Sequence, residues 1–239
     1  SVDRSFNMEF GYWDENFREW KMFVDNGIRN NAQADRFFNF DRIEGAGGVD
    51  WIHPAFPEVE IGRTATTRIL QNGSGLIAEV PLDGHDTIPH YIRASITTPE
   101  DWQRVKEERF NPDHPARKLD AQAVRRAHPD DRDYPLGIFC GSMIGRIRDM
   151  LTFEGLCYAV YDYPEMVEDM VETACSLTEQ ALDQLLPAVR FDYASGWEDI
   201  CYKNGPIVSV PFFRDVVMPR YKRIRKKLDQ YGIDLWYTD

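Results

Sequence analysis

The sequence lacks long hydrophobic runs and closely spaced cysteines. No apolar run approaches the ~20 residues that a membrane-spanning helix needs. The four cysteines, Cys140, Cys157, Cys175 and Cys201, form no C-x-x-C pair. Because disulfide frameworks and thiolate metal sites depend on such spacing, the pattern favours a reduced, cytoplasmic setting and no membrane partner.

The sequence also lacks an excess of positive charge. It has 28 Lys and Arg against 40 Asp and Glu, which gives a net charge of −12. A field of this sign repels nucleic acid and anionic membranes, and no basic stripe with interleaved aromatics offsets it. A local basic pocket is compatible with this balance, so a small-molecule substrate is the expected partner.

Recognisable cofactor and metal motifs are missing too. The segment "EGAGGVD" at 44–50 has Asp50 in place of the third glycine of a dinucleotide fingerprint, so we expect a loop there. "GIFCGSMIGRIRD" lacks the Lys-Ser/Thr ending of a phosphate-binding loop. His85 and His90 are five residues apart, which matches no strong metal pattern, so we predict no metal site.

What the sequence does contain is the pattern of one globular domain over residues 1–239. The region 1–133 predicts a helix over 15–24, a β-hairpin at about 58–81 around "QNGSG", and a helix that Thr98 caps together with Asp101. A charged, proline-broken excursion over 111–133 is expected to carry a short helix at 121–127.

Beyond Tyr134, strands and helices alternate. Apolar runs at 134–141, 191–197 and 233–239 predict strands. Helices are expected at 143–151, at 154–161, after a capping box of Asp162 and Glu165, and from Ser209 to Gly232 with a kink at Pro219. This order predicts a parallel sheet that helices cover, and such sheets bind ligands beyond the carboxyl ends of their strands.

The carboxyl ends of these strands carry the candidate chemistry. Gly141 stands before a helix whose free N–H groups suit a carboxylate or phosphate, with Arg146 and Arg148 one turn away. The alternative is that Gly141 only permits a tight turn and the arginines face solvent.

The second strand end reads "WEDICYKNG", residues 197–205. Glu198 beside the Trp197 ring is a candidate general acid or base, because partial desolvation raises a carboxyl pKa. Lys203 is its candidate charge partner, and the orienting groups are Asp199, Tyr202 and Asn204. The alternative is a salt-bridged loop with a helix cap.

Aromatic residues near the start of the chain, in "MEFGYWDENF", offer a wall for a flat ligand. Tyr12 and Trp13 are the candidates. The alternative is local hydrophobic packing.

Four segments together resemble the uroporphyrinogen decarboxylase superfamily, more narrowly its uncharacterised decarboxylase-like branch: "GIFCGSMIG", "YDYPEMVEDM", "WEDICYKNGPIVS" and "PRYKRIRKKLDQYGID". The resemblance implies a (β/α)8 TIM barrel with a cavity at the carboxyl ends of the strands. It makes Cys140, Gly141 and Met143 cavity residues, and it sets Glu198 near the family's acidic position. It also matches Asp50 to a substrate-binding aspartate.

The sequence departs from the family in two places. "EFGYWD" stands where the decarboxylases have substrate-binding arginines, so we expect uroporphyrinogen itself to be a poor substrate. Tyr237 and Asp239 stand where the related methyltransferases bind zinc through His and Cys. We therefore expect no thiolate zinc site, although Asp239 can still ligate a harder ion. Asp239 also counts among the substrate-binding candidates.

The leading hypothesis is a decarboxylase-like lyase for a carboxylated, tetrapyrrole-related substrate, with no cofactor required. One alternative is a corrinoid-dependent methyltransferase component that uses a divalent metal and a corrinoid protein. Another is a non-catalytic tetrapyrrole-binding barrel, and a homodimer is a further expected association. Because the well-defined strand–helix units begin only near Tyr134, we expect the barrel to be incomplete in this chain, a fragment whose last strand lies at an open edge.

Overall fold

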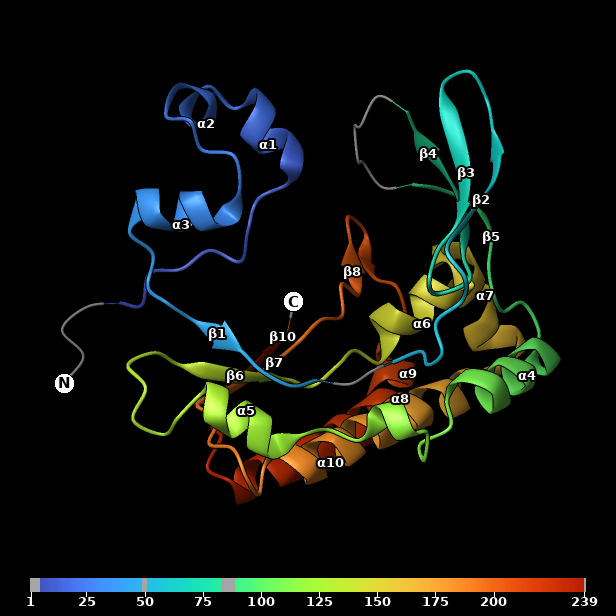
Figure 1. Cartoon of the computed structure of the whole chain (residues 1–239). Helices are drawn as coiled ribbons and strands as arrows, with labels where there is room; N and C mark the ends of the chain where they lie inside the picture. Colours follow the sequence, from blue (N-terminus) through green and yellow to red (C-terminus); the bar gives the residue numbers. More distant parts are fainter. Residues whose placement is uncertain (1–4, 49–50, 83–88, 239) are drawn as a thin grey trace.

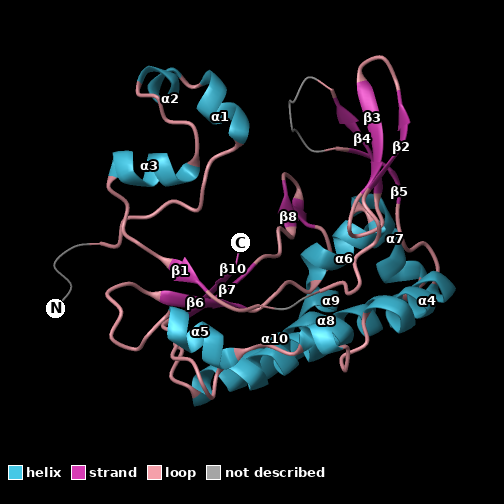
Figure 2. Cartoon of the chain, viewed as in Figure 1, coloured by secondary structure: helices cyan, strands magenta, loops and turns pink. Residues whose placement is uncertain are grey.

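The structure, a computed structural model, describes residues 5–48, 51–82 and 89–238. It is a mixed α/β protein with a four-stranded parallel sheet, a four-stranded antiparallel sheet and one small hairpin in the described residues. Figure 2 shows the helices gathered mainly below the parallel sheet and the antiparallel sheet projecting above them. The predicted α/β class is confirmed at this level.

The parallel sheet has the strand order β1-β6-β7-β10. These strands are β1 (Glu44–Gly45), β6 (Leu136–Phe139), β7 (Tyr193–Gly196) and β10 (Trp236–Thr238). The strand order follows the chain order without reversal, and β1 and β10 form the edges among the described residues. The carboxyl ends of β6 and β7, which pair in parallel, therefore lie at the same side of the sheet.

The prediction of a loop throughout 44–50 is wrong at its start. Ala46 N–H donates to the Gly137 carbonyl at 3.0 Å, and Glu44 N–H donates to the Pro135 carbonyl at 3.1 Å. These two bonds add Glu44–Gly45 to the sheet as a strand too short to show any alternation of apolar residues.

Helices follow each of the central strands (Figure 1). After β6 come α6 (Ile144–Leu151), α7 (Phe153–Asp162) and α8 (Pro164–Leu185). After β7 and the small hairpin come α9 (Val210–Phe212), a π-helical turn (Phe213–Val217) and α10 (Met218–Gln230). The buried side of α8, which includes Val167, Met170, Val171, Ala174 and Leu182, packs in the main hydrophobic core.

Two local predictions for these helices need correction. The residue that caps α8 is Tyr163 rather than Asp162, and its side chain makes no capping bond. Pro164 supplies the helical φ of the first turn instead. The expected irregularity at Pro219 appears one turn earlier, as the π-helical turn that leads into α10.

The N-terminal segment forms α1 (Asp14–Glu19), α2 (Lys21–Asp25) and α3 (Asn31–Phe38). The single helix expected over 15–24 is broken at Trp20, whose φ of −71° and ψ of 117° are extended. A small hydrophobic cluster of its own holds this segment together, with Phe17, Phe23, Ile28 and Ala34 buried.

The predicted hairpin at 58–81 is confirmed as part of a larger sheet. β3 (Thr67–Gln71) and β4 (Ile77–Pro81) flank "QNGSG", while β2 (Val59–Arg63) and β5 (His90–Arg93) extend the sheet on either side. β1 precedes this sheet, and α4 (Pro99–Arg109) and α5 (Ala121–Ala127) follow it. Thr98 Oγ1 accepts from Asp101 N–H at 3.2 Å, which confirms Thr98 as the cap of α4. The Asp101 carboxylate accepts from Thr97 instead of Thr98, so the second half of the predicted capping box is absent.

In the described part of the chain, no helix is both long and apolar enough to span a bilayer.

Candidate functional site

Glu198 lies just beyond β7 and is buried, with 2% of its surface exposed. Its carboxylate accepts the backbone N–H groups at the start of α6. Oε1 accepts from Met143 at 2.7 Å, and Oε2 accepts from Ile144 at 2.8 Å and from Gly145 at 3.0 Å. The Ser142 hydroxyl adds a bond of 3.3 Å to Oε2. Burial raises the pKa of the Glu198 carboxyl above its usual value, and these four donors oppose that effect.

The anion-binding helix end predicted after Gly141 is therefore occupied by a carboxylate of the chain itself. Gly141 has a φ of +76°, which permits the turn from β6 into α6. At Gly145 a Cβ atom would lie 2.7 Å from the Glu198 carbonyl oxygen and 2.8 Å from Ser142 Oγ. The approach of the two segments is thus as close as a glycine allows.

The next residue, Asp199, contacts Arg148 instead of the start of α6. Its carbonyl and its Oδ2 both accept from Arg148 Nη1, at 2.7 and 2.8 Å. The Arg148 guanidinium carbon lies 5.4 Å from the centroid of the Trp197 ring. Asp199 has a φ of +47°, a conformation that non-glycine residues rarely adopt. Such backbone conformations gather at functional sites.

A cavity of about 380 Å³ opens beside this ion pair. Its lining comes from β5, from the end of α6, from the start of α7 and from the segment after β7: Tyr91, Arg148, Asp149, Phe153, Asp199, Cys201, Tyr202 and Ile207. The last four of these residues follow the carboxyl end of β7 in the chain. One wall of the cavity is therefore formed by the segment after the carboxyl end of β7, the side on which parallel sheets bind their ligands.

Asp149 is the carboxyl group of this cavity that is best placed for proton transfer. Burial raises its pKa above the ordinary value, and the charges of Arg148 and Arg146 lower it in part. Its Oδ1 lies 3.9 Å from Arg148 Nη2. Burial also raises the pKa of Tyr91, and the charge of Asp149 adds to that effect. In this arrangement the half-buried carboxyl of Asp149 can hold a proton, and the cation and the phenol beside it can bind an anion.

The residues predicted in "WEDICYKNG" separate in the structure. Trp197 lies at Arg148, Glu198 at the helix end, and Asp199 and Tyr202 at the cavity. Lys203 and Asn204 form the exposed tip of the hairpin made by β8 (Cys201–Tyr202) and β9 (Gly205–Pro206). The turn is thus Lys203-Asn204, and Gly205-Pro206 is strand.

The residues predicted from "FCGSM" lie in the core rather than at the cavity. Cys140 and Met143 are each 2% exposed, and burial raises the pKa of the Cys140 thiol to about 12. Neither they nor Gly141 line the cavity among the described residues. Arg146, one turn into α6, has its guanidinium 5.8 Å from the centroid of the Phe139 ring.

The N-terminal aromatics are not brought to the cavity either. Tyr12 packs edge-on against Phe23 with ring centroids 5.0 Å apart, and it belongs to the small N-terminal cluster. Trp13 is 71% exposed. The local-packing alternative therefore fits Tyr12. Asp50, Asp239 and His85 lie outside the described residues.

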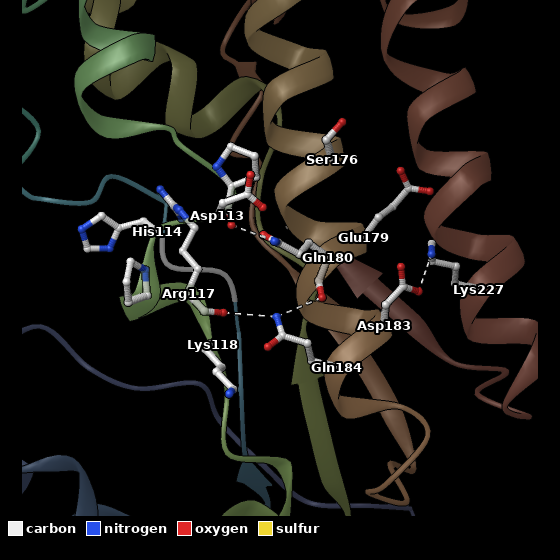
Figure 3. Close-up of a pocket in the computed structure, with 12 residues that line it drawn as sticks. Asp113, His114, Arg117, Lys118, Ser176, Glu179, Gln180, Asp183, Gln184 and Lys227 are labelled. Atoms are coloured by element: carbon white, nitrogen blue, oxygen red, sulfur yellow. Dashed lines mark hydrogen bonds and ion pairs between the residues drawn. The ribbon is translucent and has the colours of Figure 1, made fainter.

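A second hollow, a groove of about 610 Å³, lies along α8 and α10 (Figure 3). Two glutamines that line the groove donate to backbone carbonyls of the loop before α5. Gln180 Nε2 donates to the Pro112 carbonyl at 2.7 Å, and Gln184 Nε2 donates to the Arg117 carbonyl at 3.2 Å. Asp183 pairs with Lys227. These groups fasten the loop to the helices, and the groove lies on the helical layer away from the strand ends.

Sequence reasoning missed Asp149 and Tyr91. Asp149 follows Arg148 directly in "GRIRDM", so its place in the predicted helix could have marked it, whereas Tyr91 reaches the site only through the antiparallel sheet.

Across residues 5–48, 51–82 and 89–238, no group of three or more His, Cys, Asp or Glu side chains is placed to hold a metal ion. No protein-family model, no curated protein and no solved structure matches this chain.

Proposed function

We propose that this chain carries the substrate site of an enzyme with decarboxylase-like lyase activity on a small carboxylated molecule. The observation that carries the proposal is that Arg148 and Asp149 line one cavity together with the segment after the carboxyl end of β7. A guanidinium binds a carboxylate in a planar, bidentate geometry with two parallel N–H···O hydrogen bonds. A carboxyl group with a raised pKa supplies the proton that a decarboxylation consumes.

We further propose that the parallel sheet belongs to a (β/α)8 barrel of the uroporphyrinogen decarboxylase type. The strand order β1-β6-β7-β10 runs in one direction, as in a barrel, and does not reverse as in a doubly wound sheet. The long helices α8 and α10 lie together below the sheet (Figure 1). Both features support the barrel over the doubly wound alternative.

The volume of the cavity supports a substrate of one ring. At about 380 Å³ it falls near the lower end of the ~300–1,000 Å³ typical of small-molecule sites. Phe153 and Tyr202, whose ring centroids are 5.7 Å apart, supply an aromatic wall. A pyrrole or benzene ring with one or two carboxylate side chains suits this space better than a whole tetrapyrrole.

In the proposed reaction Arg148 binds one carboxylate of the substrate and orients the ring. The bond between the leaving carboxylate and its neighbouring carbon breaks, CO2 departs, and the electron pair remains on that carbon. The protonated Asp149 donates its proton to this carbon, and water then returns a proton to Asp149. The reaction thus consumes one proton and needs no external oxidant or reductant.

The test uses porphobilinogen, a single pyrrole with an acetate and a propionate side chain. We expect anaerobic incubation to release CO2 and convert the acetate to a methyl group, as detected by mass spectrometry. Asp149→Asn should lower the rate by ~10²–10⁴-fold, the usual loss for one acid/base group. The wild-type rate should fall as pH rises through the raised pKa of Asp149, because the protonated form is the donor.

Asp162→Asn is the matched control, because Asp162 is exposed at the end of α7 and its substitution removes the same charge. Binding of porphobilinogen without turnover would favour a non-catalytic binding protein. An Asp149→Asn variant with the wild-type rate would remove Asp149 from the mechanism.

A further inference from the structure

Arg148 and Asp199 differ strongly in exposure although they are paired. The Arg148 side chain is 17% exposed, and the Asp199 side chain is 59% exposed. The cation is therefore a fixed part of the cavity wall, while its carboxylate partner stands at the solvent boundary. Asp199 can return to water when it leaves Arg148, whereas Arg148 stays in the cavity with only the longer contact of 3.9 Å to Asp149, which leaves its Nη1 group open to another anion.

The backbone at Asp199 has an unfavourable conformation at the point where it contacts Arg148. Its φ of +47° is tolerated by Asp and Asn more readily than by other non-glycine residues, yet it persists mainly where the surroundings enforce it. Arg148 Nη1 donates to both the carbonyl and the carboxylate of Asp199, so one guanidinium nitrogen contacts its backbone and its side chain. Loss of this contact would release the backbone and the carboxylate of Asp199 together.

The position of Asp199 in the chain makes it a pivot. On one side, Glu198 is fixed in the start of α6 by the three backbone N–H groups already described. On the other side, the Ile207 N–H donates to the Ile200 carbonyl at 2.7 Å and closes the base of the β8–β9 hairpin. Cys201 and Tyr202 of that hairpin line the cavity. A change at Asp199 therefore moves one wall of the cavity.

We propose that Asp199 occupies the carboxylate subsite of Arg148 as an internal competitor, and that an incoming carboxylate displaces it and releases the β8–β9 hairpin. This inference rests on the proposed function, since it assumes that the cavity accepts a carboxylated ligand. It adds a selection step: a neutral molecule of the same shape cannot take Arg148 from Asp199, whereas an anion can.

The first experiment measures binding of benzoate and of benzamide by isothermal titration calorimetry. The two probes have nearly the same shape, but only benzoate carries a charge. Asp199→Asn keeps the size of the side chain and tolerates a positive φ, while it removes the competing charge. We expect benzoate to bind about tenfold more tightly to this variant than to the wild type, the factor that corresponds to loss of one charge-assisted hydrogen bond.

Benzamide should bind both proteins equally. Asp183→Asn is the matched control, because it removes the same charge from an ion pair outside the cavity, the pair of Asp183 with Lys227. It should leave benzoate binding unchanged. Arg148→Gln should abolish the difference between benzoate and benzamide.

The second experiment follows the motion of the β8–β9 hairpin, first without ligand and then with benzoate. A nitroxide is attached at Asn204→Cys on the exposed tip, in a protein with Cys157→Ser and Cys201→Ser, because Cys140 and Cys175 are buried. We expect a narrower electron paramagnetic resonance spectrum after Asp199→Asn, and the same narrowing when benzoate is added to the protein that retains Asp199.

The outcomes separate the two proposals. Equal benzoate affinity for the wild type and the Asp199→Asn variant, with binding lost in Arg148→Gln, overturns the internal competitor and leaves the carboxylate site standing. An unchanged nitroxide spectrum after Asp199→Asn also overturns it. If benzoate and porphobilinogen bind to neither the wild type nor the variant, the carboxylate site and the competitor both fail.

Discussion

Glu198→Gln tests whether this residue acts mainly on stability or on chemistry. The carboxylate accepts four donors, three of them backbone N–H groups of α6. If the glutamine oxygen takes the place of Oε2, its NH2 group faces the Met143 N–H, and two buried donors confront each other. One unsatisfied buried donor costs about 1–3 kcal/mol. Loss of the negative charge at the helix start costs about 0.3–2 kcal/mol, but this is offset because the burial that raises the pKa of Glu198 no longer acts on a charged group.

We therefore expect Glu198→Gln to lower the free energy of unfolding by about 1–3 kcal/mol, mainly through the unsatisfied donor. For a chain of this length that corresponds to a fall in Tm of roughly 2–12 °C. Thermal unfolding followed by circular dichroism at neutral pH measures the shift. Glu165→Gln is the control, because Glu165 is exposed in the first turn of α8.

A different result would restore the role that the sequence suggested for Glu198. If Glu198→Gln unfolds within about 1 °C of the wild type and yet loses turnover, the residue is an acid or base rather than a structural carboxylate. Reduced stability with turnover retained below the lowered Tm would support the structural role.

Two further substitutions test neighbouring features. Gly145→Ala should destabilise the fold by about 1–3 kcal/mol in urea unfolding, because a Cβ would lie 2.7 Å from the Glu198 carbonyl oxygen. Gly155→Ala is the control: its Cβ would have its nearest neighbour at 3.4 Å, so the change should be neutral or stabilising. Equal effects of the two substitutions would contradict the close approach at Gly145. Hydrogen bonds from Thr97 and from Arg104 lower the pKa of Asp101 to about 2. This carboxylate therefore stabilises the fold above its unfolded pKa of about 3.9, and the contribution, about 1–2 kcal/mol, is lost as pH falls towards 2. Asp101→Asn should thus be less stable than the wild type at pH 6 and equally stable near pH 2; a pH-independent difference would contradict this.

The parts of the fold that sequence predicts well are those that local residues determine. The helix at 121–127 has its predicted bounds, and Thr98 caps α4, because both depend on neighbours within one turn. The hairpin around "QNGSG" follows from its turn residues. By contrast, Trp20 interrupts a helical pattern in favour of a local aromatic cluster, where its ring lies 5.5 Å from that of Phe23.

The candidate site could be predicted only in part, since its contacts join distant segments. Glu198 and Gly145 are 53 residues apart, and nothing in either local pattern pairs them. The cavity likewise combines Tyr91 of the antiparallel sheet with Asp149 of α6 and Tyr202 of the hairpin. Position at a strand end pointed to the segment after β7, but the direction of each side chain depended on the tertiary structure.

The contact between Glu198 and α6 changes which residues are available for chemistry. An anion-binding helix end and a buried carboxylate each suggest function when considered alone, yet here each satisfies the other. The neighbouring pair is different, because Asp199 is largely exposed and Arg148 lines a cavity with Asp149. Under the displacement proposed above, the segment after β7 has one fixed carboxylate, Glu198, and one movable carboxylate, Asp199. We therefore expect a substrate carboxylate to compete with Asp199 and not with Glu198, and substitutions of Arg148, Asp149 and Asp199 to affect ligand binding most.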